Sequence, residues 1–86
     1  MKIWAKCLRE QKIQKDVVQE FASARPSDFA GWSVVLDSLC KALDLSRPVM
    51  MNKHLRELQQ FSRTVFYAAD FMESVGFDRF EIEIFP

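Results

Sequence analysis

The feature that most constrains the fold is an alternation near the C-terminus. Along the segment RFEIEIF, apolar and charged residues alternate one by one, with Phe80, Ile82 and Ile84 on one side and Arg79, Glu81 and Glu83 on the other. Because successive side chains of a strand point to opposite faces, this period of two predicts a half-buried strand over Arg79–Phe85. The surrounding segment 61–86 holds six of the eight phenylalanines and the only tyrosine, so we expect it to supply much of the core.

Two further strands are expected at the N-terminus, over Lys2–Leu8 and Lys12–Phe21. In the first, one face carries Ile3, Ala5 and Cys7; in the second, one face carries Ile13, Val17 and Phe21 with Lys15 and Gln19 between them. The polar link 9–11 joins the two strands as a hairpin. It contains neither the Gly nor the Asn that tight hairpin turns favour.

The main helix is expected from Ser27 or Asp28 to Ala42 or Leu43, with Ser27 as its N-cap and Asp28 in its first turn. Its apolar stripe has helical spacing and consists of Phe29, Trp32, Leu36, Leu39, Cys40 and Leu43, with Val35 at the margin. Gly31 is a small residue that we expect to let this helix approach the sheet closely.

The second half of the chain predicts shorter elements. After Pro48, residues 49–51 are either a brief strand or a buried linker. A helix over Lys53–Phe61 follows, capped by Asn52, with an inward face of Leu55, Leu58 and either Phe61 or its neighbours. Because Phe61, Phe66 and Phe71 are five residues apart, one straight helix cannot bury all three, which places a break at residues 62–64. A third short helix is then expected over Ala68–Val75, ended by Gly76.

These elements predict a single α+β domain over residues 1–86. Its antiparallel sheet has three or four strands: the N-terminal hairpin, the short strand after the main helix and the C-terminal strand. The main helix and the two shorter ones are expected on one face of that sheet.

Compartment is inferred from what the sequence lacks. No run approaches the roughly 18–20 apolar residues of a membrane span, and the charged N-terminus has no apolar signal-peptide segment. Cys7 and Cys40 are 33 residues apart without a CxxC motif, so we expect both to be reduced and buried. Together these features predict a cytoplasmic protein.

Catalytic and cofactor chemistry finds no support in the sequence. A Cys40–His54 nucleophilic pair is formally available, but Cys40 lies on the apolar face of the main helix, where a thiol is inert. Cys7, Cys40 and His54 lack any metal-binding spacing. Gly31 and Gly76 are too far apart for a phosphate-binding loop. We therefore predict a chain without catalytic residues, cofactor or metal, and thus not an enzyme.

One possible binding surface is a basic cluster formed by Arg47, Lys53, His54, Arg56 and Arg63. Four of these residues, Arg47, Lys53, Arg56 and Arg63, could contact nucleic acid, with Phe61 or Phe66 stacking on bases. Against this alternative, the net charge of the chain is zero and no nucleic-acid-binding motif is present.

The favoured hypothesis is a small protein-interaction or accessory module that binds a protein partner or a second copy of itself. Aromatic residues make up 13% of the chain, which is more than a small core needs, and successive segments carry opposite net charge. If the strand Arg79–Phe85 lies at a sheet edge, a partner strand could add to it. The opposing interpretation is that Glu81 and Glu83 prevent such pairing.

Four segments carry a resemblance to known proteins: DLSRPV at 44–49, FSRTVF at 61–66, DFMESV at 70–75 and FDRFEI at 77–82. With the opening MKIWAK, they resemble a group of short bacterial proteins, about 85 residues long, of unknown function. The resemblance implies a free-standing bacterial protein and brings no activity, cofactor or site residues. It does draw attention to Arg63, which we expect to form an ion pair with Asp70 or Asp78.

Overall fold

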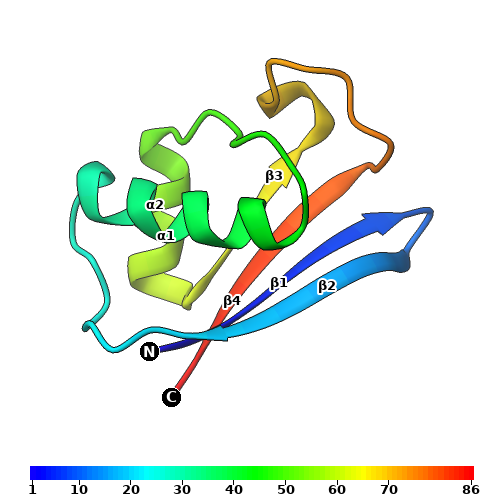
Figure 1. The fold of residues 1–86 in the computed structure, drawn as a ribbon. Helices are drawn as coiled ribbons and strands as arrows, with labels where there is room; N and C mark the ends of the chain where they lie inside the picture. The colour runs from blue at the N-terminus through cyan, green and yellow to red at the C-terminus, as the bar shows by residue number, and fades with distance from the viewer.

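The computed structural model describes residues 1–86 and contains a four-stranded antiparallel sheet and two α-helices (Figure 1). In chain order the elements are β1 (Lys2–Arg9), β2 (Lys12–Glu20), α1 (Phe29–Ala42), α2 (Asn52–Phe61), β3 (Arg63–Tyr67), a 3₁₀ turn (Ala68–Asp70) and β4 (Arg79–Phe85). The predicted α+β class and antiparallel sheet are confirmed.

The first and last strands form the centre of the sheet. Its strand order is β2-β1-β4-β3, and β1 pairs with β4 from Lys2 opposite Phe85 to Leu8 opposite Arg79. Phe80, Ile82 and Ile84 are buried as the alternation predicts. The edge position considered for this strand is wrong, since β4 has a neighbour on each side.

The hairpin between β1 and β2 closes through Glu10 and Gln11, which have φ values of 52° and 67°. Two successive positive φ values are typical of the type I′ turn, whose twist matches that of the strands. The side chain of Asp78 supports this turn, because its Oδ2 accepts a hydrogen bond from the Glu10 backbone N–H at 2.8 Å. The tight turn thus forms without Gly or Asn.

A register shift in β2 corrects one predicted face. Cys7 pairs with Lys15 but Leu8 pairs with Ile13, which leaves Gln14 as an extra residue. Ile13 therefore lies on the opposite face from Lys15 and is exposed, contrary to the expected shared face.

Helix α1 begins one residue later than Ser27 capping would require. Asp28 is the N-cap, and its Oδ1 accepts from the Gly31 N–H at 2.8 Å. Gly31 is required by a close approach, but to the preceding loop: a Cβ there would lie 2.7 Å from Cβ of Pro26. The predicted stripe is largely buried, except that Phe29 is partly exposed at the helix start.

The segment 49–67 differs most from expectation. Residues 49–51 form no strand; the remaining strand, β3, follows α2 directly. Ser62, with φ of 59°, ends the helix and reverses the chain. His54 and Leu58 are the buried residues of α2, whereas Phe61 is 67% exposed and not inward.

The predicted third helix is reduced to the 3₁₀ turn, and the chain from Phe71 to Asp78 contains no helix or strand. The side chain of Asp70 folds back, and its Oδ2 accepts from the Tyr67 N–H at 2.9 Å. Phe71 and Phe77 remain buried and meet edge to face, with ring centroids 5.2 Å apart. These rings attach the irregular segment to the core without a helix.

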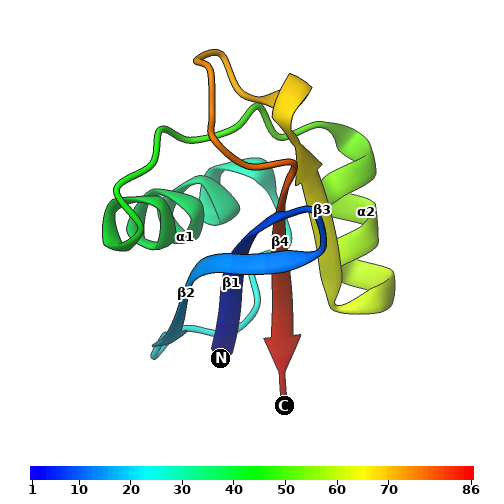
Figure 2. The ribbon, with the colours of Figure 1, turned by 90° about the vertical axis from the view of Figure 1, so that its right-hand side faces the viewer.

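The two helices take different positions against the sheet (Figure 2). Helix α1 contributes Trp32, Val35, Leu36 and Leu39 to the core that also contains the inward residues of β1 and β4. Helix α2 lies beside β3, at the other end of the sheet. Neither helix is long and apolar enough to span a membrane.

Candidate interaction surface

Both edges of the sheet are obstructed, which limits where a partner strand could add. On β2, Lys15 points to the inner face and its Nζ donates to the carbonyl of Leu43 at the end of α1. An inward-pointing lysine next to a bulge is a common defence of an edge strand. At the opposite edge, α2 packs along β3. Addition of a partner strand is therefore disfavoured at both edges of the sheet.

The outer face of the sheet is the surface that no helix covers. Figure 2 views the sheet from this side, and neither helix crosses in front of the strands. The pairing registers place one outward set of residues here: Lys2, Trp4, Lys6 and Leu8 from β1, Ile13, Asp16, Val18 and Glu20 from β2, Arg63, Val65 and Tyr67 from β3, and Arg79, Glu81, Glu83 and Phe85 from β4. We call this set the outer face.

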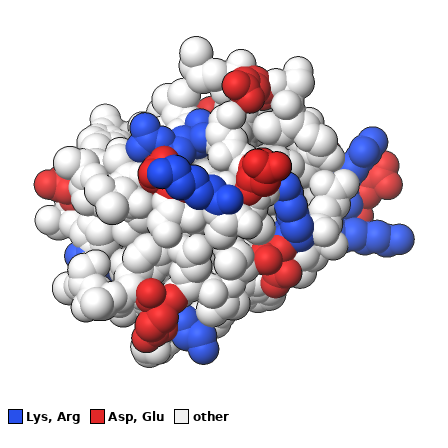
Figure 3. Space-filling view, viewed as in Figure 1, with Lys and Arg blue, Asp and Glu red and all other residues white.

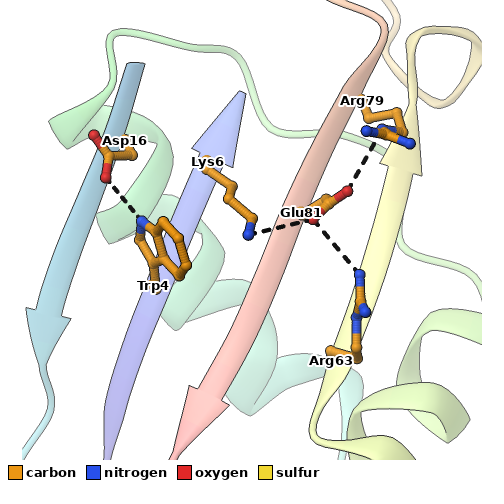
Figure 4. Close-up of polar contacts among 6 residues, drawn as sticks. All are labelled: Trp4, Lys6, Asp16, Arg63, Arg79 and Glu81. Carbon is orange, nitrogen blue, oxygen red and sulfur yellow. Dashed lines mark hydrogen bonds and ion pairs between the residues drawn. The ribbon is translucent and has the colours of Figure 1, made fainter. Parts of the chain in front are cut away.

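Glu81 lies at the centre of the outer face and is surrounded by three cations (Figure 4). Its carboxylate is 3.6 Å from Lys6 Nζ, 3.5 Å from Arg63 Nη2 and 3.5 Å from Arg79 Nε. Lys6 lies directly opposite Glu81 on β1, whereas Arg63 comes from β3 on the other side of β4. The Glu81 side chain is only 12% exposed. Such a carboxylate needs its cations, because burial of an uncompensated charge is costly.

Trp4 is the aromatic centre of the same face. Its indole N–H donates to Asp16 Oδ2 at 2.8 Å, as Figure 4 shows. The Lys6 ammonium lies 3.8 Å from the centroid of its ring, a cation–π contact. On the β4 side, the ring of Phe85 stacks at a centroid distance of 6.4 Å. These contacts fix the orientation of Trp4 although it is only partly buried.

The predicted basic cluster does not form one surface. His54 is fully buried, and Arg47 donates to the carbonyl of Ser33 at 3.3 Å beside α1. Lys53 and Arg63 do come together, along a groove between α2 and β3. The predicted partner of Arg63 is wrong: it pairs with Glu81, not with Asp70 or Asp78.

His54 instead joins three elements in the interior. Its Nδ1 accepts from the Met51 N–H at 2.9 Å, which leaves the proton on Nε2. Nε2 lies 3.7 Å from Asp70 Oδ2, and the ring stacks on Phe66 at 4.2 Å. Burial lowers the pKa of His54, although the Asp70 carboxylate opposes this shift. At neutral pH the imidazole is therefore uncharged.

Cys40 and His54 do not form a nucleophilic pair, since the polar and ring contacts of His54 are to Met51, Phe66 and Asp70. Burial, together with the neighbouring Cys7 thiol, raises the pKa of Cys40 to about 11. Both cysteines are free and buried. A thiol with so high a pKa stays protonated at neutral pH and is a poor nucleophile.

Trp4, Lys6 and Tyr67 are surface residues that the sequence did not single out. The outward positions of β1 were visible in the alternation, but their neighbours depend on the pairing of β1 with β4.

No group of three or more His, Cys, Asp or Glu side chains is placed to hold a metal ion. Charges of both signs are interspersed on the side shown in Figure 3, without a continuous field of one sign. No protein-family model, curated protein or solved structure matches the chain.

Proposed function

We propose that this chain is a non-catalytic protein-interaction module that associates with a second copy of itself through the outer face. The observation that carries the proposal is an ordered surface of aromatic and charged residues that no helix covers. Tryptophan, tyrosine, phenylalanine and arginine, all present on this face, are enriched at contacts between proteins. The free thiols of Cys7 and Cys40 support a reducing, cytoplasmic compartment.

The charge of the outer face favours a protein over nucleic acid. It carries four basic and four acidic residues: Lys2, Lys6, Arg63 and Arg79 against Asp16, Glu20, Glu81 and Glu83. A polyanion would meet a carboxylate beside each cation, and its binding depends on uncompensated positive charge. A second copy has the same balance of charges, so it meets no net repulsion.

The strand order supports a complementary arrangement of two outer faces. A two-fold axis parallel to the strands, between β1 and β4, sets β1 of each copy over β4 of its partner. In this arrangement Lys6 lies opposite Glu81 and Trp4 lies opposite Glu83, as follows from the registers. No like-charged pair is created. An axis perpendicular to the strands instead brings Glu81 toward Glu83, so the parallel axis is preferred.

The size of the face predicts weak association. Four strands about 4.8 Å apart and about seven residues long span roughly 14 Å by 23 Å, or about 300 Å² in projection. Stable interfaces bury about 800 Å² per partner. We therefore expect a concentration-dependent dimer with a dissociation constant in the micromolar range or weaker.

Analytical ultracentrifugation from about 10 μM to 1 mM tests the proposal, with variants that differ only in charge at one position. Trp4→Glu sets a like charge opposite Glu83 of the partner and should abolish dimerisation. Trp4→Lys loses the same ring but introduces an opposite charge, so it should dimerise more tightly than Trp4→Glu. Val34→Glu is the control, because Val34 is 72% exposed on α1, away from the outer face.

Circular dichroism would establish that each variant is folded. A wild-type chain that stays monomeric at 1 mM would overturn the proposal. So would equal dimerisation of Trp4→Glu and Trp4→Lys, since the arrangement depends on the charge opposite Glu83.

A further inference from the structure

A groove of about 260 Å³ runs between α2 and β3 at the rim of the outer face. From the helix it is lined by Lys53, Glu57 and Phe61, which are four residues apart and share one side of α2. From the strand it is lined by Arg63, Val65 and Tyr67. These are every second residue of β3, so their side chains all point to the outer face. Its walls are thus fixed by two regular elements.

The two ends of the groove carry the same chemistry. Because Ser62 reverses the chain between α2 and β3, Phe61 and Arg63 lie at one end and Lys53 and Tyr67 at the other. Eight residues of helix at about 1.5 Å each give about 12 Å between the ends. Four residues of strand at about 3.3 Å give about 13 Å, in agreement.

The charges and rings at these ends are accessible. Phe61 is 67% exposed and Tyr67 is 53% exposed. No carboxylate lies within 4.0 Å of Lys53 Nζ, and Arg63 has only the shared carboxylate of Glu81. Each end therefore combines a cation with an exposed aromatic ring, which suits a carboxylate side chain whose aliphatic stem packs on the ring.

The middle of the groove differs from its ends. Glu57 is held there because its Oε1 accepts from Thr64 Oγ1 at 2.7 Å. A continuous polyanion would place a negative charge beside the Glu57 carboxylate and be repelled. A segment with separated negative charges can leave this position uncharged. Val65 lies at the same level and offers an apolar contact.

We propose that this groove binds an extended acidic segment of another protein, with carboxylate side chains four residues apart and an apolar residue midway. In an extended chain such residues point to one side and are about 13 Å apart, which matches the distance between the two ends. The groove shares Arg63, Val65 and Tyr67 with the outer face, but both of its walls belong to one copy of the chain, so the proposal does not depend on self-association.

Fluorescence anisotropy with labelled seven-residue peptides tests the groove, at protein concentrations where the chain is monomeric by ultracentrifugation. The probe has Glu at its second and sixth positions and Val at its fourth. Matched probes have Glu at the second and fourth positions, or Lys in place of both Glu residues. We expect the first probe to bind most tightly and the Lys probe not to bind.

Variants assign the binding to the groove. Lys53→Glu should weaken the first probe about five- to tenfold, the effect of reversing one partly exposed ion pair. Phe61→Ser should also weaken it. Lys12→Glu is the matched control, because Lys12 is an exposed lysine on the hairpin, and it should leave binding unchanged.

Three results would overturn the proposal. They are the absence of peptide binding, equal affinity for the two Glu spacings, and equal weakening by Lys53→Glu and Lys12→Glu. A labelled single-stranded oligonucleotide is measured alongside the peptides. If it binds more tightly than the first probe and loses affinity with Lys53→Glu, the groove is a nucleic-acid site instead.

Discussion

The inner and outer faces of the sheet are made by the same four strands but differ in burial and in chemistry. On the inner face, Ile3, Ala5, Cys7, Phe66, Phe80 and Ile82 are all fully buried, and Thr64 is the polar exception among its buried positions. On the outer face, Glu81 and its three cations alternate with aromatic rings. The inner face therefore supplies stability, and the outer face carries the charges and rings on which the proposed association depends.

The largest expected change in stability comes from comparing two phenylalanines on opposite faces of β4. Phe80→Ala should lower the free energy of unfolding by about 3–5 kcal/mol, because it leaves a cavity among buried rings. Phe85→Ala removes a partly exposed ring and should cost less than about 1.5 kcal/mol. Urea denaturation measures both values. If Phe80→Ala does not fold, Phe80→Leu should still cost more than Phe85→Ala. Equal losses would show that the two faces contribute alike.

A second prediction concerns the one titratable ring on the buried side. Because burial lowers the pKa of His54 below its usual 6.5, the unfolded chain takes up a proton that the folded chain does not. Stability should be unaffected by this group above pH 6.5 and should fall as the pH drops below it, by at most about 1.4 kcal/mol per pH unit.

Thermal unfolding between pH 8 and pH 5.5 measures this dependence. His54→Asn keeps an acceptor for the Met51 N–H but cannot titrate, so its stability should be lower overall and flatter over this range. A slope that is the same in wild type and variant would exclude His54 as its source.

A third prediction concerns the outer carboxylates. Glu81→Gln leaves three cations without their shared counter-charge and should cost about 1–2 kcal/mol, between the values for exposed and buried pairs. Glu83→Gln is the matched control on the same face, because no Lys or Arg nitrogen lies within 4.0 Å of Glu83. The difference between the two variants should shrink in 1 M NaCl, which screens partly exposed pairs. A difference that is independent of salt would contradict an electrostatic role.

The sequence predicted those elements whose pattern is local. The strand Arg79–Phe85 and the main helix are legible because alternation and helical spacing each extend over several residues. β3 was missed because the segment 63–67 follows α2 after a single residue, so its β-branched Thr64 and Val65 were interpreted only as a break. The expected helix at 68–75 failed because Asp70 bonds back to the Tyr67 N–H and directs the chain out of a helical path.

The candidate surfaces were less predictable than the fold. Lys6 and Glu81 each stood on the outward side of a correctly predicted strand, yet they are 75 residues apart in sequence. Only the pairing of β1 with β4 brings them to 3.6 Å. The sequence predicts His54 in a basic cluster because it stands beside Lys53, near the start of a helix, where side chains are usually exposed. Its burial depends on the position of α2 beside β3, which periodicity does not define.

The central position of β1 and β4 has a consequence for how the chain folds. Their pairing closes a loop of nearly the whole sequence, from Leu8 to Arg79, at an entropic cost of roughly 4 kcal/mol. The β1–β2 hairpin and the α2–β3 unit close over a few residues, so we expect them to form first and the sheet centre to form late. A chain whose ends are joined near Lys2 and Phe85, which are paired neighbours, would make that late step local. It should fold faster than the linear chain, with little change in the rate of unfolding.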